Sequence, residues 1–460
     1  MVALDVRQGA GAPAEAGVPS RKAQLWLLLL IFLLMACNYI DRTIIRILAQ
    51  PIAREFSLTD FQVGLLSGLA FAVLYVLLAV PISVWSEQRN RVHIVSGAIA
   101  IWSVMTMLCG AAASYAQLFL ARVGVGIGEA GAAPTTHSLI ADYFPPERRA
   151  SAISVHSFGI AVGAILGSVI GGFVAERWGW RAALLVVGLP GLALAVLMLT
   201  VREPARGTFD RSPGRQTGLW PTATLLFTNR TFLHLAIGSG VLNLAVNGLH
   251  TFEASYFIRS YELSLGQAGA VVGLTSGVST AIGMLAGGFV VDRLVRRDPR
   301  WYAWLPALGV GLAAPLYAAV FLQATWLPAA ILLATPGLFL FLYVAPVHAI
   351  IHNICHARMR ATAVALYMLI TAGLGVAMGP VVTGYLADRF ASASFQGAGA
   401  YATVCSGASP IQQCRDASAA GLQAALVAVC ILLVWGAAHF LAAARSVRAD
   451  IGRPLGVAAA

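Results

Sequence analysis

The sequence has few charged residues and a single lysine. Charged side chains make up 11% of the 460 residues, against about 25% in an ordinary soluble domain. Because lysine occurs only at Lys22, arginine carries almost all of the positive charge behind the net value of +11. The arginines fall at the ends of apolar segments and form no patch with interleaved aromatic residues. This placement argues against a nucleic-acid partner.

Signatures of catalysis are also missing from the sequence. There is no phosphate-binding loop, no zinc-ligand spacing and no nucleophile motif. We therefore predict no cofactor, no metal site and no enzymatic activity, so that any transport draws on a gradient or runs downhill. No cleavable signal peptide is expected, because the first apolar run, Leu25 to Tyr39, lacks a small-residue cleavage site and continues as helix.

Apolar residues, in contrast, are abundant at 59% and occur in long runs. About 20 mostly apolar residues suffice for one helix across a bilayer. The runs and the breakers between them predict twelve transmembrane helices, at 23–48, 59–86, 91–113, 117–141, 148–174, 181–201, 230–258, 264–291, 302–322, 327–350, 358–387 and 418–444. The fold class is therefore an all-α membrane protein.

The distribution of basic residues predicts the orientation. With both termini in the cytoplasm, the inside segments hold 21 Lys and Arg residues and the outside segments seven, as the positive-inside rule requires. The excess of arginine over lysine, together with abundant alanine and glycine, indicates a GC-rich bacterial gene. The expected location is therefore the inner membrane of a bacterium. Cys405 and Cys414 then lie in an outside loop, where an oxidising compartment lets them form a disulfide.

The two halves of the chain repeat each other. Gln62-x-Gly64-x-x-x-Gly68 recurs 205 residues later as Gln267-x-Gly269-x-x-x-Gly273, and the same offset carries Glu87 onto Asp292 and Arg91 onto Arg296. A second match joins Gly172-Phe-x-Ala-Glu176-Arg177 to Gly384-Tyr-x-Ala-Asp388-Arg389. Both copies start on the same side, so the repeat is parallel and the substrate should lie between the halves. The predicted organisation is a cytoplasmic tail (1–22), a six-helix bundle (23–201), a cytoplasmic linker (202–229), a second bundle (230–445) and a cytoplasmic tail (446–460).

These motifs resemble the major facilitator superfamily. Gly288-x-x-x-Asp292-Arg293-x-x-Arg296-Arg297 matches its loop motif, whereas the first-half copy has Ser83 and Glu87 in place of glycine and aspartate. Asn38-Tyr39-Ile40-Asp41-Arg42 and Arg122-x-Gly-x-Gly-x-Gly128-Glu129 resemble the Spinster-like branch. The resemblance implies a proton-linked carrier of sphingolipids or lysophospholipids. Gly159-x3-Gly163-x3-Gly167 resembles an antiporter motif, although such a row also serves close helix packing.

Four ionisable residues lie deep in the predicted spans: Asp41, Arg42, Arg122 and Glu129. Each would cost about 2.5–3.5 kcal/mol at a helix centre, so such residues normally pair and face a cavity. Arginine does not release its proton. We therefore predict Asp41 and Glu129 as proton carriers with Arg42 and Arg122 as their charge partners. A structural charge pair that locks the helices together is the alternative.

Further sites follow from helix faces and from the loop motif. Asn243, Asn247 and His250 share one face of the seventh helix and are candidates for lining the cavity; Glu253 continues toward the outer end as an interfacial residue. The predicted cytoplasmic gate consists of charges at matching helix ends, Glu87, Arg91, Asp292, Arg293 and Arg296.

The function that these features favour is proton-coupled secondary transport of an amphipathic, lipid-like molecule by alternating access. A carrier of a drug, sugar or organic anion with the same fold is the main alternative. A membrane-embedded lipid enzyme or a receptor is a different class that the sequence supports less. We expect a monomer whose partners are the substrate, protons and membrane lipids.

Overall fold

The computed structural model describes residues 19–455 except Glu87, Gly207, 210–218, 356–358, 406–410 and 453–454. The described chain is helical almost throughout. Its first half contains α1 (Arg21–Ile47), α2 (Ala49–Phe56), α3 (Asp60–Gly64), η1 (Leu65–Leu69), α4 (Ala70–Ser86), α5 (Arg91–Ala111), α6 (Tyr115–Ala130), α7 (Ala132–Tyr143) and α8 (Pro146–Met198). The remainder contains α9 (Leu219–Thr228), α10 (Arg230–Tyr261), α11 (Leu265–Leu294), α12 (Trp301–Phe321), α13 (Trp326–Leu333), α14 (Pro336–Leu340), η2 (Phe341–Tyr343), α15 (Val344–Ile354), α16 (Arg360–Thr371), η4 (Ala372–Ala377), α17 (Met378–Ser394), α18 (Tyr401–Val404), α19 (Gln412–Ala443) and α20 (Val447–Gly452).

Ten helices of the described chain are long and apolar enough to cross a membrane. One of them, α8, has 53 residues and would be about 80 Å long if straight. It turns back at Gly179, where φ is +83°, so it makes two passes. A further pass consists of α6 and α7, which are interrupted at Gly131. The described residues therefore contain the twelve passes that the sequence predicts.

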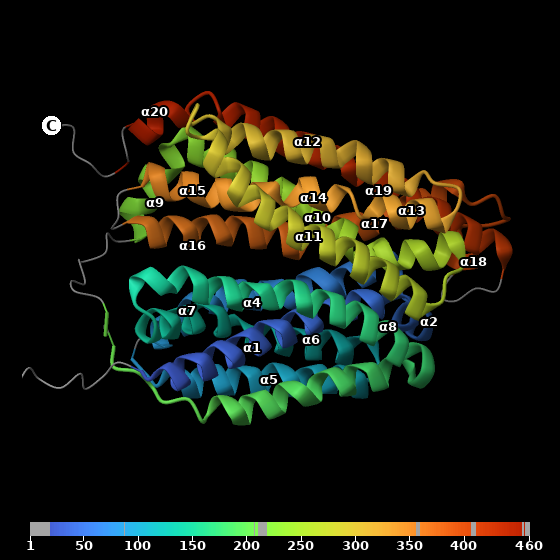
Figure 1. Cartoon of the computed structure of the whole chain (residues 1–460). Helices are drawn as coiled ribbons and strands as arrows, with labels where there is room; N and C mark the ends of the chain where they lie inside the picture. Colours follow the sequence, from blue (N-terminus) through green and yellow to red (C-terminus); the bar gives the residue numbers. More distant parts are fainter. Residues whose placement is uncertain are drawn as a thin grey trace, which may run out of the picture.

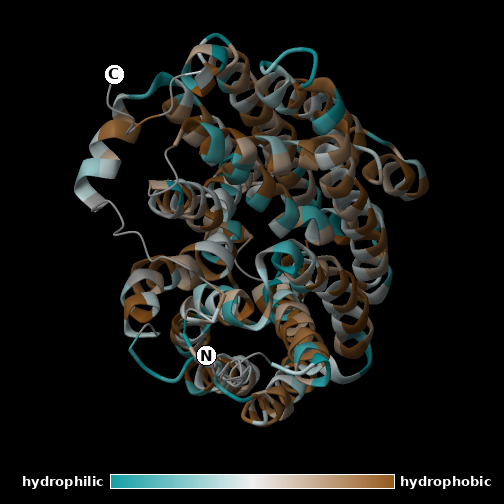
Figure 2. Cartoon of the chain, turned by 60° about the vertical axis from the view of Figure 1, so that its left-hand side comes forward, coloured by the Kyte–Doolittle hydropathy of each residue, from teal (hydrophilic) through white to brown (hydrophobic). Residues whose placement is uncertain are grey.

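The two halves form two layers of roughly parallel helices, α1 to α8 in one and α10 to α20 in the other (Figure 1). Each layer has its own cluster of buried apolar residues. Hydrophobic residues predominate on the long helices, and hydrophilic stretches lie in the loops and at some places inside the bundle (Figure 2). The predicted linker, 202–229, includes helix α9, which packs against α10 and α16.

The internal repeat appears in the structure as two matching helix starts. Thr59 and Gln62 form a capping box at the start of α3, and Ser264 and Gln267 form one at the start of α11. In each box the hydroxyl accepts from a backbone N–H while the glutamine side chain accepts from the cap residue's own N–H. The repeat thus starts two equivalent helices, one in each half.

The two layers meet closely at one end of the bundle. We call the end where α1 begins and α19 ends the terminal face, and the other end the opposite face (Figure 1). Near the opposite face, α3 and η1 pack on α17, and α8 packs on α11. A Cβ atom added at Gly64, Gly269 or Gly384 would collide with backbone atoms of the other half. Only glycine permits this approach of the two backbones.

The glycine row of α8 is used for packing within the first half. A Cβ atom at Gly159 would lie 2.6 Å from the carbonyl oxygen of Phe32, and one at Gly167 would lie 2.9 Å from Ile40. Both neighbours belong to α1, so the row that resembles an antiporter motif holds α1 and α8 in close contact.

Candidate functional site

Glu129 and Arg42 form a buried ion pair between α6 and α1. Arg42 donates from Nε to Glu129 Oε2 over 2.9 Å, and its Nη2 lies 2.8 Å from the same oxygen. The guanidinium of Arg42 also lies over the rings of Phe71 (4.7 Å) and Tyr75 (4.9 Å) of α4. A cation with a carboxylate and two aromatic faces around it is stabilised away from water. The structure therefore brings two of the four predicted charges into direct contact.

Asp41 lies next to Arg42 in sequence but points to a different helix. Its Oδ1 accepts a hydrogen bond of 2.7 Å from the hydroxyl of Thr106 on α5, and the residue is 2% exposed. Thr106 is not among the predicted site residues, because a single threonine in an apolar helix is common and carries no distinctive spacing. The hydroxyl can donate to the carboxylate or accept from the protonated acid, so it accommodates both forms of Asp41.

Arg122 is buried near the other charges without a direct ion pair to either acid. Its guanidinium carbon lies 5.5 Å from the centre of the Phe71 ring, the ring that Arg42 also covers. Within the described part of the chain, its Nε has no hydrogen-bond partner. Arg122 is thus a cation without a carboxylate partner among these residues. The acid Asp41, in the same cluster, has the hydroxyl of Thr106 as its hydrogen-bond partner.

The predicted polar face of α10 makes three different contacts. Asn243 donates to the hydroxyl of Tyr343 over 3.3 Å, and the Nε2 of His250 lies 3.4 Å from the hydroxyl of Tyr317. Asn247 accepts a hydrogen bond of 3.1 Å from Arg46 of α1. This last bond joins the two halves in the interior of the bundle.

Two residues differ from their sequence-based assignment. Arg46, at the outer end of the predicted span 23–48, was counted among the seven outside basic residues, yet its guanidinium points into the bundle and donates to Asn247. Glu253 was expected at the interface, yet its side chain is fully buried. The reason is that α10 continues for eight residues beyond it, to Tyr261, about 12 Å of further helix.

The predicted gate residues behave differently in the two halves. Arg91 is 1% exposed and binds Asp142 (2.5 Å) and Glu203 (2.7 Å), both in its own half. The second-half residues Asp292, Arg293 and Arg296 are exposed. Glu87 lies outside the described residues. Arg91 therefore joins the start of α5 to the end of α7 and to the segment after α8, and does not reach across to the second half.

We expect Arg91→Ala to lower the stability of the protein strongly. Removing one partner of a buried ion pair costs about 3–5 kcal/mol, because the remaining charges stay buried without compensation. Arg296→Ala removes the repeat-related arginine, which is exposed, and serves as the matched control. Thermal unfolding of the purified variants, followed by tryptophan fluorescence, measures the difference. Equal melting temperatures for the two variants would contradict this role of Arg91.

Glu176 and Asp388 occupy equivalent positions in the internal repeat, and each of them caps the start of a helix in the other half. Glu176, on α8, accepts hydrogen bonds from the hydroxyl of Ser264 (2.9 Å) and the backbone N–H of Gly266 (2.7 Å) at the start of α11. Asp388, on α17, accepts from the backbone N–H groups of Asp60 (3.0 Å) and Phe61 (2.9 Å) at the start of α3. The repeat was visible in the sequence, but the partner of each acid was not. We call Glu176 and Asp388 the crossed caps.

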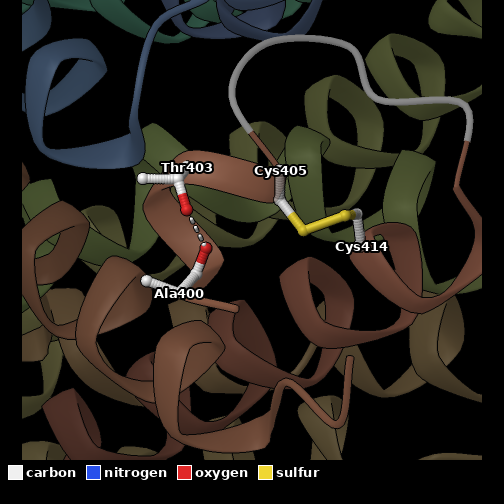
Figure 3. The surroundings of a disulfide bond; sticks show 4 residues. All are labelled: Ala400, Thr403, Cys405 and Cys414. Atoms are coloured by element: carbon white, nitrogen blue, oxygen red, sulfur yellow. Dashed lines mark hydrogen bonds between the residues drawn. A yellow bond between two sulfur atoms is a disulfide. The ribbon is translucent and has the colours of Figure 1, made fainter. Parts of the chain in front are cut away.

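The opposite face also carries the predicted cysteine pair. A disulfide joins Cys405, which follows α18, to Cys414 near the start of α19 (Figure 3). Their Cα atoms are 5.4 Å apart, within the usual range for a disulfide. Beside it, the hydroxyl of Thr403 donates to the carbonyl oxygen of Ala400 over 2.8 Å.

Comparison with known proteins agrees with this architecture. The pattern of the Major Facilitator Superfamily matches residues 31–380. An MFS-type efflux pump of Mycolicibacterium smegmatis is 32% identical, and the match covers 76% of this chain and 81% of that protein. Protein spinster homolog 1 of Bos taurus is 28% identical, with 76% and 71% covered.

A solved structure extends the likeness to three dimensions. The crystal structure of a bacterial homologue of the human lysosomal transporter Spinster, in an inward-facing and unoccupied conformation, superposes with a TM-score of 0.84 at 32% identity. The superposition covers 94% of this chain and 99% of that one. Both the predicted fold and the predicted resemblance are thereby confirmed: the chain is a multi-pass membrane transporter that belongs to the major facilitator superfamily, in its Spinster-like branch.

Proposed function

We propose that this transporter moves an amphipathic, lipid-like substrate, of the lysophospholipid or sphingolipid class, in exchange for protons. The observation that carries the proposal is the buried charge cluster of the first half. It combines an ion pair, Arg42 with Glu129, and a carboxylate, Asp41, whose hydrogen-bond partner is a hydroxyl. The likeness to Spinster proteins supports the substrate class.

The cluster offers a route for coupling. Burial favours the neutral form of an acid, whereas a nearby arginine favours the ionised form. Arg122 has no described carboxylate at hydrogen-bond distance, and it becomes a partner for Asp41 or Glu129 if movement of the helices brings the groups together. If rocking of the halves exchanges these partners, an acid takes up a proton on one side and releases it on the other. The arginines remain charged throughout the cycle.

Alternating access requires that the halves separate at one end while they close at the other. The close glycine contacts and the crossed caps hold the opposite face together. We propose that the terminal face is cytoplasmic, in a bacterial inner membrane, as the arginine distribution favours. In that orientation the structure corresponds to the inward-facing state. The exposed residues Asp292, Arg293 and Arg296 can then form contacts with the first half when the cytoplasmic side closes.

Reconstitution into liposomes that contain a pH-sensitive dye tests the proposal. A lysophospholipid, a sphingoid base, a sugar acid and a cationic drug are offered in turn under an imposed pH gradient. We expect the lipids to produce substrate-dependent proton flux and the sugar acid to produce none. The similarity to an MFS-type efflux pump favours a drug as the second candidate substrate, so proton flux with the drug alone would replace the lipid assignment. Substrate flux without any proton flux would refute coupling.

The disulfide provides a test of the proposed orientation. In intact cells, a membrane-impermeant maleimide should label the protein only after treatment with an impermeant reductant, because Cys405 and Cys414 are then outside and bonded to each other. A variant with both cysteines changed to serine is the control for labelling at the other four. Labelling without reductant would contradict the pairing, and labelling only after cell lysis would contradict the orientation.

A further inference from the structure

The second half contains a buried carboxylate that the charge cluster of the first half does not include. Glu253 lies on α10 with its side chain 0% exposed. Its Oε2 accepts a long hydrogen bond of 3.2 Å from the hydroxyl of Ser276 on α11. No described residue is at hydrogen-bond distance from its Oε1. A single hydroxyl does not compensate an ionised carboxylate for the loss of water, so Glu253 needs either a proton or a cation.

The groups packed around Glu253 determine which of these it can obtain. On its own helix, the Nε2 of His250 lies 3.9 Å from Oε1. Tyr317 of α12 contacts that same histidine nitrogen. From the other half, Arg46 of α1 reaches α10 and donates a hydrogen bond of 3.1 Å to Asn247. Among these groups Arg46 is the one permanent cation, since histidine in a dry site is easily neutral.

Arg46 is held away from the carboxylate by an amide. Its hydrogen bond goes to Asn247, six residues before Glu253 on the same helix. A carboxylate is a stronger partner for a guanidinium than an amide oxygen is, because opposite charges attract and two parallel hydrogen bonds can form. Glu253 lies about 9 Å further along the axis of α10 than Asn247, and movement of α1 against α10 changes the distance of Arg46 to each.

We propose that Glu253 is a further proton-carrying carboxylate, protonated while Arg46 is bound to Asn247 and ionised when Arg46 moves to it. The inference rests on the proposed proton coupling and extends it to the other half. Because Arg46 belongs to one half and Glu253 to the other, protonation of Glu253 is linked to the relative position of the halves. Both halves then contribute titrating carboxylates to the cycle.

Infrared titration of the purified full-length protein in lipid nanodiscs tests this without requiring transport. A protonated carboxyl group absorbs in a region free of amide bands. We expect the wild-type band to contain a component that Glu253→Gln removes and Glu262→Gln retains. Glu262 ends the same helix and is exposed, so it is the matched control. A band that Glu253→Gln leaves unchanged at every pH overturns the proposal.

Two variants that keep the carboxylate complete the experiment. Ser276→Ala should shift the frequency of the Glu253 component, because the hydroxyl that bonds the carboxyl group is gone. Arg46→Gln should let that component persist to higher pH, because removing a nearby cation makes an acid easier to protonate. A component insensitive to both changes does not belong to Glu253 and refutes the assignment. If the wild-type protein shows the infrared component but no proton-driven transport in the liposome assay, the proposed coupling through Asp41 and Glu129 is wrong, whereas the protonation of Glu253 stands.

Discussion

Asp41→Asn and Glu129→Gln are each expected to abolish proton-driven transport while the protein still folds. Both acids are buried, and each amide keeps the shape of the side chain but cannot titrate. In Asp41→Asn the hydroxyl of Thr106 can still donate to the amide oxygen, so the local packing is preserved. Glu129→Gln leaves Arg42 with a neutral partner and should reduce stability more. Transport in liposomes under an imposed pH gradient, together with thermal unfolding, measures both effects.

Substrate exchange without a pH gradient separates coupling from binding. A variant that lacks only the proton carrier should still exchange labelled for unlabelled substrate across the membrane. Glu147→Gln, an exposed acid at the start of α8, is the control for a change of charge. Full pH-driven transport with an unaltered pH dependence in Asp41→Asn or in Glu129→Gln would exclude that residue as an obligatory proton carrier.

Removing both crossed caps should shift the protein toward the outward-facing state. Each carboxylate accepts two hydrogen bonds from the first turn of a helix in the other half, where the helix dipole adds to the attraction. Hydrogen bonds to a charged group contribute about 1.5–3 kcal/mol. Loss of one such contribution changes the ratio of the two states roughly ten- to a hundredfold. Glu176→Gln combined with Asp388→Asn should exceed either single change.

Spin labels at Arg177 and Arg415 report the separation of the halves at the opposite face, since both residues are exposed there. Glu55→Gln is the matched control. Hydrogen bonds from Arg181 and Trp180 hold the pKa of Glu55 below its ordinary value, so it is ionised, but both partners lie in its own half. Identical distance distributions for wild type and the double variant would show that the caps do not hold this face closed.

The sequence was sufficient for the fold because its signals are local. Helix length, apolar composition and breakers such as Gly179 act within one segment, and capping residues fix where the segments begin. The Thr59 and Ser264 boxes were contained in the repeated sequence for this reason.

Contacts between helices could not be predicted in the same way, because they depend on how each helix is rotated and how deeply it sits. Arg122 and Glu129 are seven residues apart and so share one face of α6, yet the cation beside Glu129 is Arg42 of α1. Arg46 lies one residue before the end of α1, and the sequence does not show that its side chain turns toward Asn247 of the other half. Arg91 matched Arg296 in the repeat, but only the structure shows that Asp142 and Glu203 enclose it.

The crossed caps have the reciprocal arrangement of contacts that is found in a symmetric dimer. In a dimer with two-fold symmetry, a residue that contacts a site on its partner receives the same contact in return. Glu176 and Asp388 reproduce this exchange within one polypeptide, at positions that the repeat makes equivalent. Neither half is complete alone, because each lacks an acceptor that the other supplies. The interface therefore keeps the form of an isologous dimer, as expected for a duplicated and fused gene. In a dimer of identical subunits a mutation would change both caps at once. In this chain one cap can change while the other is kept.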